Sequence, residues 1–419
     1  MSNSGLLTSR RFVFGFNDGT LGLFAVSILL YGAALWSAQS PNVEKTDFSL
    51  TYVGAKIEHE GLGQRLYDIT LQKQTRDSLF QHPSPLFFEH PPFEALLFSP
   101  LAALPFRTAY EIWALCNATL WLVMIFLLRK HFPWPDDDLG YLFFWLLFAP
   151  LWVALYQGQS SLLLLALYAI TFVKLKFGRE FVAGLALGFG LFKLQFVLPF
   201  ALIFLLRKKW RFLFGFGTTS ILLALLSLIA VGWHGVCDYF RFLSAIGSNP
   251  QNESFGSAVD MPTLHGLIYA VLGHKIPHQA LNILVVSLSV LLLGVVAWRW
   301  KSLRSFDSLD LMFAAAFAAS LVTGSHMFTH DFSPLILAMF LAAASFSSGA
   351  SKALVAPQLA LIVSLVLFWA FPIYFVFVAW HCLFLMCPIL LLFIWAASKA
   401  ASSVELPANE TDLQSATAG

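Results

Sequence analysis

The chain has very little charge for its length. Only 11% of its 419 residues are charged and 58% are hydrophobic, whereas a soluble protein of this size has about 25% charged residues. Three long runs contain no Asp, Glu, Lys or Arg: Phe212–Trp233, Phe332–Ser351 and Ala353–Ser398. Because about 20 apolar residues are enough to cross a bilayer as a helix, this scarcity excludes an ordinary soluble protein. It predicts an all-α, polytopic transmembrane helical bundle.

The sequence also lacks an excess of either charge and has few cysteines. The formal net charge is +2, so there is no basic field to neutralise the phosphates of a nucleic acid, and nucleic acid is excluded as a partner. The four cysteines lie mostly in apolar runs and imply no disulfide framework. No cleavable signal is expected, because the first apolar run is long enough to remain as a span.

Basic residues stand at the ends of the apolar runs and predict the topology. Arg10 and Arg11 precede the first span, so the positive-inside rule places the N-terminus in the cytoplasm. Counting from there gives about ten full spans, among them Gly140–Tyr156 and two last spans on either side of Phe371-Pro372. We expect residues 1–400 to form a single integral membrane domain. Its outer segments would be 39–107 and 235–277, and residues 401–419 would be a disordered cytoplasmic tail.

One apolar run conflicts with a simple count of spans. Phe181–Leu206 is flanked by Arg179 and by Arg207-Lys208-Lys209, and both basic groups are expected on the cytoplasmic side. A hairpin of two short helices that turns near Lys193 satisfies both. Such a turn is tolerated at membrane depth only where protein shelters it or a watery cavity reaches it. Lys193 is therefore predicted to be a buried cation at the tip of the hairpin.

Polar clusters gather on the predicted outer face. Asp47 opens a segment whose apolar residues recur at helical spacing, which predicts an amphipathic helix lying on the membrane. An acid at that place is either an ordinary helix N-cap or a catalytic carboxylate. Glu89-His90-Pro91-Pro92 leads into Phe93–Phe106, an apolar helix too short to span. His90 is then either part of a structural Pro-Pro turn or a functional residue, and the plain interpretation of Glu94 is a cap of that helix.

Four further residues each have two interpretations. His326 and His330 are four apart and could ligate a metal from one helical face, but no third ligand follows at a suitable spacing. A histidine next to Asp331 is better suited to anion binding or proton transfer. Lys193 either contacts an anion or extends to the interface. Gln159 either binds a substrate or satisfies backbone groups at the start of a helix.

The order of these pieces resembles the membrane-embedded C-type glycosyltransferases, and in particular glycosyltransferase family 87. The resemblance runs from about Asp47 to about Pro334. The motifs that carry it are, in chain order, Asp47-Phe48, Pro91-Pro92-Phe93, Pro100-Leu101, Leu104-Pro105-Phe106, Gly158-Gln159, Ala183-Gly184-Leu185, Lys193 and His330-Asp331. Two positions depart from the family, which more often has an aromatic residue at His90 and an Asn where Ser160-Ser161 stand.

The resemblance implies a fold, a reaction and a set of site residues. The reaction is inverting transfer of a hexose, with mannose expected, from a polyprenyl-phosphate-sugar donor to a lipid or glycan acceptor. Asp47 is implied as the general base on the acceptor hydroxyl, and Lys193 and His330 as the residues that bind the donor phosphate. No cofactor or metal ligand is predicted, although a requirement for a divalent cation stays open. Four more residues are expected to bind substrate: His90, Gln159, His326 and Asp331.

The expected location is the inner (plasma) membrane of a bacterium, with membrane lipid around the protein and the active site on the outer face. Two other functions stay open. A transporter or lipid flippase usually shows internal repeats and polar residues along a path through the membrane, and neither is found in the sequence. A polymerase or ligase of lipid-linked glycans would be expected to use more outer arginines than this chain offers, which are Arg65, Arg76, Arg107 and Arg241.

Overall fold

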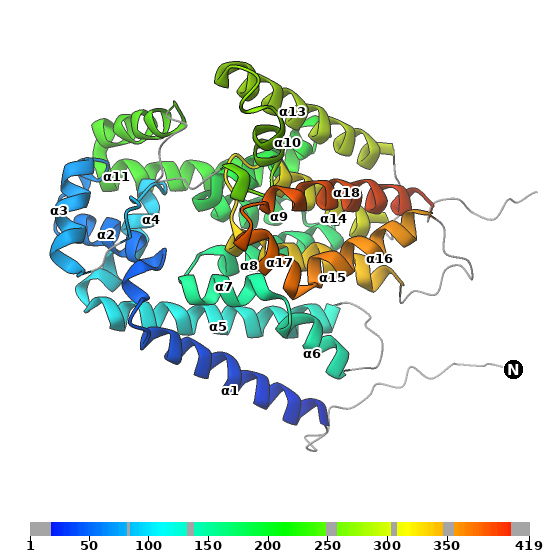
Figure 1. The fold of residues 1–419 in the computed structure, drawn as a ribbon, viewed down its shortest axis with the longest axis horizontal. Helices are drawn as coiled ribbons and strands as arrows, with labels where there is room; N and C mark the ends of the chain where they lie inside the picture. Colours follow the sequence, from blue (N-terminus) through cyan, green and yellow to red (C-terminus); the bar gives the residue numbers. More distant parts are fainter. Residues whose placement is uncertain are drawn as a thin grey trace, which may run out of the picture.

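The computed structural model describes residues 18–81, 84–131, 138–248, 258–302, 308–346 and 356–403. Within these ranges the chain forms α-helices and short 3-10 helices and no β-strand, so the prediction of an all-α protein is confirmed. Figure 1 shows a helical bundle in which the start of α1 and the end of α18 lie at the same end. The helices are α1 (Asp18–Ala38), η1 (Val43–Lys45), α2 (Phe48–His59), η2 (Gly63–Arg65), α3 (Ile69–Leu79), α4 (Pro92–Phe98), η3 (Ser99–Ala103), α5 (Phe106–His131), α6 (Asp138–Leu146), α7 (Ala149–Gln157), α8 (Ser161–Lys176), α9 (Glu180–Gly188), η4 (Phe189–Lys193), α10 (Leu194–Leu206), α11 (Trp210–Ser248), η6 (Ala258–Asp260), α12 (Leu264–Leu272), α13 (His278–Ser302), α14 (Ser308–Val322), η7 (Thr329–Phe332), α15 (Leu335–Phe346), α16 (Ala356–Trp369), α17 (Phe371–Ala379), η8 (Leu383–Leu385) and α18 (Met386–Ser403).

The described residues contain six helical stretches that are long and apolar enough to cross a membrane, or eight if each of two bent pairs counts as one span. The bent pairs are α6 with α7, at 52°, and α16 with α17, at 67°. Each break has a proline just after it, Pro150 at the start of α7 and Pro372 at the start of α17. Proline is tolerated there but cannot continue the preceding helix. The protein is therefore a polytopic helical membrane protein, and the count of ten full spans is not confirmed.

Two helices carry much of the surface that faces lipid. α13 and α11 expose large apolar side chains, for example Ile283 and Ile229. α11 also exposes Trp210 at its start and Trp233 just after its bend at Gly232; the helix from Trp210 to Val231, before the bend, is about 33 Å long. Tryptophan prefers the two interfaces of a bilayer, and the hydrocarbon core is about 30 Å thick. This part of α11 therefore matches the thickness of a membrane.

The centre of the bundle is formed by α14 and α15. Their residues are almost all buried from Leu311 to Val322 and from Leu335 to Ala342, and α14 packs on both α15 and α18. α14 is only 15 residues long. Because it contacts protein instead of lipid, it does not need to match the thickness of the bilayer.

The segment from Glu180 to Leu206 folds back on itself. It has the length and composition of one span of 27 residues, but a straight helix of that length would separate its ends by about 40 Å. Instead, Lys209 Nζ lies 2.7 Å from Glu180 Oε1, so the two ends lie together. α9 leads in, η4 makes the turn and α10 leads back. This is the hairpin that the charge pattern predicts, with Lys193 buried at its tip.

The two ends of the bundle differ in chemistry. At the start of α8, Ser161 contacts the polar cluster described below. At the end of α8, Lys176 Nζ lies 2.9 Å from Asp310 Oδ2. A helix of 16 residues is about 24 Å long, so the polar cluster and this basic end are far apart. The guanidinium of Arg207 lies over the ring of Trp300, 4.1 Å from its centre, so further basic residues also pack at helix ends.

Residues 39–107, predicted to lie on the outer side and called the first outer segment below, are a group of short packed helices. α2 forms as predicted, but its apolar side chains, such as Phe48 and Ile57, are buried by protein. The ring of Phe48 lies 6.1 Å from that of Phe98 and 6.1 Å from that of Phe106. The expectation that α2 lies on the membrane is therefore wrong, because α4, η3 and the start of α5 cover its apolar face.

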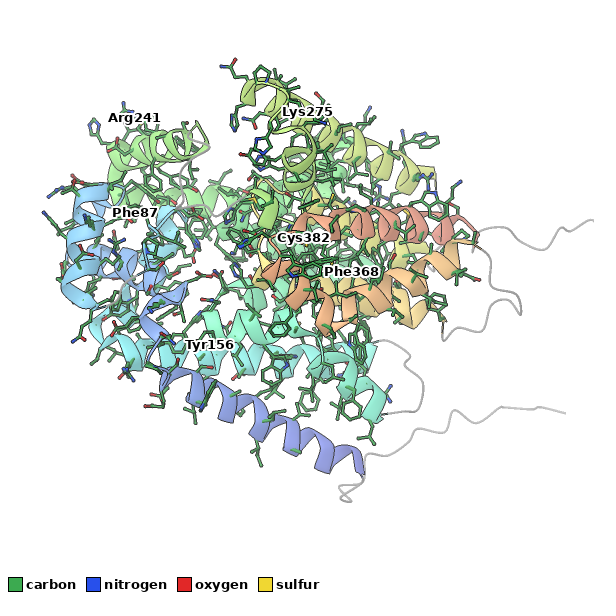
Figure 2. All side chains as sticks on the ribbon, viewed as in Figure 1. Phe87, Tyr156, Arg241, Lys275, Phe368 and Cys382 are labelled. Carbon is green, nitrogen blue, oxygen red and sulfur yellow. The ribbon has the colours of Figure 1, made fainter. Side chains whose placement is uncertain are left out.

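The second outer segment, predicted as a loop over residues 235–277, is largely helical where it is described. α11 bends at Gly232, whose φ of 67° and ψ of 178° belong to a region that is open essentially only to glycine. Beyond the bend, an arm of α11 packs on the first outer segment, with the ring of Tyr239 5.0 Å from that of Tyr67. Figure 2 shows Arg241 on this arm at the same end of the molecule as Phe87.

Two expectations fall outside the described residues. Residues 249–257 of the second outer segment and residues 404–419 of the predicted tail are not described. The last described residue is Ser403, at the end of α18.

Candidate active site

A cavity of about 480 Å³ opens between the first outer segment, the tip of the hairpin and η7. Its volume is within the range of roughly 300–1,000 Å³ that is usual for small-molecule sites. All seven site residues predicted from the sequence line it, so the fold brings them together from five separate parts of the chain. The lining residues are Asp47, Leu50, Leu86, Phe87, Glu89, His90, Pro91, Gln159, Phe192, Lys193, Leu194, Gln195, Leu198, Pro199, Tyr239, Leu243, Thr323, Ser325, His326, Phe328, His330 and Asp331.

Gln159 joins Asp47 to Lys193. Its Nε2 donates to Asp47 Oδ2 at 2.7 Å, and its Oε1 accepts from Lys193 Nζ at 2.9 Å. Its side chain therefore holds two other side chains of the cavity. This decides against the alternative that Gln159 only satisfies backbone groups at a helix start.

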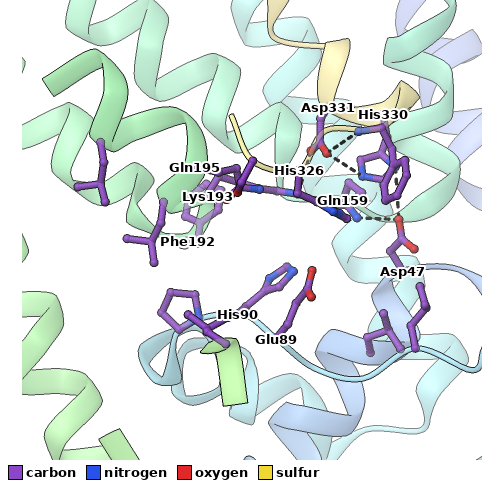
Figure 3. A pocket seen from close by; sticks show the side chains of 18 of the residues that line it. Asp47, Glu89, His90, Gln159, Phe192, Lys193, Gln195, His326, His330 and Asp331 are labelled. Atoms are coloured by element: carbon purple, nitrogen blue, oxygen red, sulfur yellow. Dashed lines mark hydrogen bonds and ion pairs between the residues drawn. The ribbon is translucent and has the colours of Figure 1, made fainter. Parts of the chain in front are cut away.

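His330 and Asp331 complete the network. Lys193 Nζ donates to Asp331 Oδ1 at 2.9 Å. His330 lies between two carboxylates, with Nε2 3.3 Å from Asp331 Oδ2 and Nδ1 3.4 Å from Asp47 Oδ2. The contacts thus form a closed ring, visible in Figure 3. We call these five residues the polar ring: Asp47, Gln159, Lys193, His330 and Asp331.

Asp331 holds the polar ring from its buried side. Its carboxylate is 1% exposed and also accepts hydrogen bonds from Ser161 Oγ and from the backbone N–H of Phe328, both at 3.2 Å. A buried carboxylate is tolerated when it is paired and hydrogen-bonded. Asp331 therefore fixes Lys193 and His330 in place from behind, while Asp47 lies on the open side.

The position of Asp47 is not that of an ordinary N-cap. It stands before α2, but its side chain makes no capping hydrogen bond. Its backbone N–H donates to Gln157 Oε1 at 3.1 Å, and its carboxylate contacts Gln159 and His330. The side chain is 22% exposed, so part of it is open to the cavity. The N-cap interpretation is therefore wrong, and the carboxylate is held by the site.

A tight turn after α7 brings Gln159 to Asp47. Gly158 has a φ of 61°, a left-handed conformation that glycine adopts without strain. A Cβ at Gly158 would also meet the Cβ of Phe48 at 2.8 Å, so glycine allows this turn to lie directly against the start of α2. Trp113 Nε1 of α5 donates to the Gly158 carbonyl at 2.7 Å and fixes the turn from the other side.

The opposite wall of the cavity carries a second polar pair. His90 Nδ1 lies 2.7 Å from Glu94 Oε2, and Glu94 Oε1 accepts from Ser160 Oγ at 3.3 Å. Burial by itself would lower the pKa of His90, but the charge of Glu94 and the hydrogen bond to it together raise that pKa. Glu94 is thus not simply a helix cap, as its plain interpretation predicted, because its carboxylate holds His90 and Ser160.

Glu89 is a cavity residue that was not among the predicted site residues. It lines the cavity next to His90, and burial raises its pKa to about 7, against the opposing charges of His90 and Lys193. The signal in the sequence was its position directly before His90, a predicted site residue. What separates it from the many surface acids is the shape of the folded cavity, which no spacing along the chain reveals.

His326 and His330 do not share one helical face. The chain between α14 and η7 is not helical, and Phe328 has extended backbone angles of −117° and −177°. The expectation that the two histidines share one helical face is therefore wrong. His326 packs edge-on against Phe328, with ring centres 4.5 Å apart, and burial lowers its pKa to about 4. Within the described ranges, no group of three or more His, Cys, Asp or Glu is placed to hold a metal ion.

Comparison with known proteins identifies one region of the chain. The model of the family described as Glycosyltransferase family 87 matches residues 87–329, which is more than half of the chain. The match covers both walls of the cavity and ends one residue before His330, while Asp47 precedes it. No curated protein and no solved structure matches the chain.

Proposed function

The chain belongs to glycosyltransferase family 87, and from this premise we propose that it transfers a hexose, mannose in our proposal, from a polyprenyl-phosphate donor to a lipid or glycan acceptor. The observation that carries the proposal is the polar ring on one wall of a single cavity. It holds a partly open carboxylate, Asp47, beside two groups that suit a phosphate, Lys193 and His330. A base and anion-binding groups side by side are what sugar transfer from a phosphate requires.

The proposed reaction is a single displacement. The acceptor oxygen attacks the anomeric carbon of the hexose, and the bond from that carbon to the phosphate oxygen breaks on the opposite side, so the configuration inverts. The proton of the acceptor hydroxyl passes to Asp47, and polyprenyl phosphate leaves with the bonding electrons and one additional negative charge. General base catalysis by a placed carboxylate contributes typically 10²–10⁴-fold to a rate.

Lys193 is suited to bind the phosphate as its charge grows. An ammonium group has three N–H donors, and two of those of Lys193 donate to Gln159 and Asp331. The third has no partner among the described residues and is proposed to donate to a phosphate oxygen. A cation fixed in this way stabilises the leaving group more than the ground state, which is the condition for acceleration. We propose His330 as the second phosphate contact.

The remaining predicted residues are proposed to have two kinds of role, positioning of other side chains and contact with the substrate. Gln159 and Asp331 hold the catalytic side chains in place. His90 and His326 line the cavity and are proposed to contact the sugar or its phosphate. No cofactor enters this reaction, and a divalent cation is not needed for the proposed charge balance.

We further propose that the protein lies in the inner membrane of a bacterium, with both termini in the cytoplasm and the cavity at the outer face. The supporting observation is the separation between the polar ring and the basic end of α8, about 24 Å along the helix. Basic residues favour the cytoplasmic side, which leaves the cavity on the other side.

The test is sugar transfer by the purified protein in detergent, with radiolabelled polyprenyl-phosphate-mannose and a total lipid extract. Asp47→Asn keeps the shape and the hydrogen bond from Gln159 but removes the base, so we expect the rate to fall at least about 100-fold. Glu60→Gln is the matched control, because Glu60 is exposed and, among the described residues, pairs only with Lys56, at 3.5 Å. We expect its rate to equal that of the wild type.

Three outcomes would contradict three different parts of the proposal: the base, the sugar and the activity. Equal rates for Asp47→Asn and the wild type would remove the role of Asp47. Transfer from another hexose donor but not from the mannose donor would correct the sugar. Lipid movement in protein-containing liposomes, without transfer from any donor, would replace the transferase with a flippase.

A further inference from the structure

Glu89 faces the polar ring across the cavity. Figure 3 shows Glu89 and His90 on one wall, with Lys193, His326 and Gln159 opposite and Asp47 towards one end. A substrate group that contacts Lys193 and reaches Asp47 must pass in front of this wall. Glu89 therefore lies beside the path between the proposed phosphate contact and the proposed base.

The backbone on both sides of Glu89 is fixed by side chains of the outer segment. Gln72 accepts from the Phe88 N–H at 2.8 Å and donates to the Phe88 carbonyl at 3.2 Å. Tyr67 Oη donates to the His90 carbonyl at 2.7 Å. Gln72 itself is buried. The carboxyl group is thus presented to the cavity from a rigid base, which is the arrangement that a specific binding contact requires.

The two acids of this wall have different tasks. Glu94 is saturated by His90 and Ser160. Glu89, in contrast, receives no hydrogen bond from any other residue in the described part of the chain, although it lines the cavity. A polar group in a partly desolvated place without a partner costs stability, and a bound ligand would supply the missing partner.

The charge around Glu89 suits a sugar next to a phosphate. Its carboxyl group is exposed to the charges of His90, Lys193, Asp331 and Asp47, and it acts in turn on Tyr239 of α11. Burial, the largest influence, raises its pKa to about 7, so near neutral pH it is protonated part of the time. A protonated carboxyl group both donates and accepts hydrogen bonds and does not repel a phosphate. These are the properties that a contact with sugar hydroxyls needs.

We propose that Glu89 is a specificity-determining residue that hydrogen-bonds a hydroxyl group of the transferred hexose while the hexose lies between Lys193 and Asp47. This inference rests on the proposed function, because it takes the hexose donor as the ligand. It assigns sugar recognition to the wall opposite the base, and it separates that task from the binding of the phosphate.

The experiment compares donors across variants in the detergent transfer assay. The donors are polyprenyl-phosphate-mannose and counterparts that each lack one hydroxyl of the hexose. The proteins are the wild type, Glu89→Ala, Glu89→Gln and the control Glu60→Gln. For the wild type we expect kcat/KM for one counterpart to be at least about tenfold below that of the full donor. In Glu89→Ala that ratio should shrink to within about threefold, because the partner of the missing hydroxyl is gone.

Glu89→Gln keeps a group that can donate and accept a hydrogen bond, so it should retain part of the discrimination and also report on folding. A uniform fall in rate for all donors in both variants would overturn the inference and leave the proposed function intact. Discrimination in Glu89→Ala equal to that of the wild type would do the same. If the wild type transferred sugar from none of the donors, the proposed function itself would fail, and the inference with it.

Discussion

Lys193 is a cation held away from solvent, and its position depends on a small number of contacts. Its side chain is 6% exposed and that of Asp331 is 1% exposed, with 2.9 Å between Nζ and Oδ1. Removing two charges from water costs free energy. Their mutual attraction offsets this cost only if both partners and their hydrogen bonds are present. Here Lys193 also donates to Gln159, and Asp331 also accepts from Ser161.

We predict that Lys193→Met destabilises the protein strongly, by about 3–5 kcal/mol, because it removes the ammonium group that pairs with the buried carboxylate of Asp331. The double variant Lys193→Met/Asp331→Asn should recover a large part of that loss. Thermal unfolding in detergent, compared between the variants, measures both effects.

The control for this prediction is the ion pair at the other end of α8. Lys176→Met removes one partner of a pair in which Lys176 is 34% exposed, so it should cost at most about 1 kcal/mol. A Lys193→Met variant as stable as Lys176→Met would show that Asp331 is neutral or hydrated in the folded protein.

At the scale of elements, the hairpin depends on a close approach between α9 and α11. A Cβ built on Gly184 would collide with the carbonyl oxygen of Phe212, and one built on Gly215 would collide with that of Phe181. One glycine lies on each helix, so the backbones of α9 and α11 can come into direct contact. Small residues at helix contacts allow this kind of packing in membranes.

We predict that Gly184→Ala destabilises the hairpin by about 1–3 kcal/mol, because the backbone of α11 must move to admit the methyl group. Gly217→Ala, on the same helix as Gly215, is the control, since nothing lies within 4 Å of its Cβ and alanine favours a helix. Melting temperatures in detergent separate the two. If Gly184→Ala melted at or above the temperature of Gly217→Ala, the packing argument would be wrong.

Charge at the ends of the apolar runs was enough to predict the hairpin, because Arg179 and Arg207 had to share a side and one straight helix could not place them there. The bend between α6 and α7 was missed, although Pro150 signals it, because the apolar run continues through the break. The contacts of the polar ring could not be predicted. Gln159 meets Asp47 across 112 positions of the chain, and such a contact depends on how whole helices pack. The position of Glu89 in the cavity could not be predicted either, because it also depends on how the helices pack.

At the scale of the whole molecule, the separation of the cavity from the basic end predicts a defined orientation in the membrane. A variant without the four native cysteines can carry one new cysteine at Glu60, in the outer segment, or at Ser402, near the end of α18; both positions are exposed. We predict that a membrane-impermeant maleimide labels Glu60→Cys in intact spheroplasts and labels Ser402→Cys only after permeabilisation.

Labelling of both proteins in detergent is the control for reactivity. The reverse pattern would place the cavity in the cytoplasm, and labelling of both positions in intact spheroplasts would contradict the topology as a whole. Either result would leave the cavity itself unchanged, because its geometry depends on contacts within the protein.

The bend at Gly232 is a single backbone position that sets where one wall of the cavity lies. The 16 residues of α11 that follow it act as a lever arm of about 24 Å, and this arm carries Tyr239 and Leu243 into the cavity lining. A rotation of a few degrees at the pivot moves the far end of such an arm by one or two ångströms, roughly the size of a hydroxyl group. Under the proposed function, a change in sugar preference therefore need not alter any residue that touches the sugar.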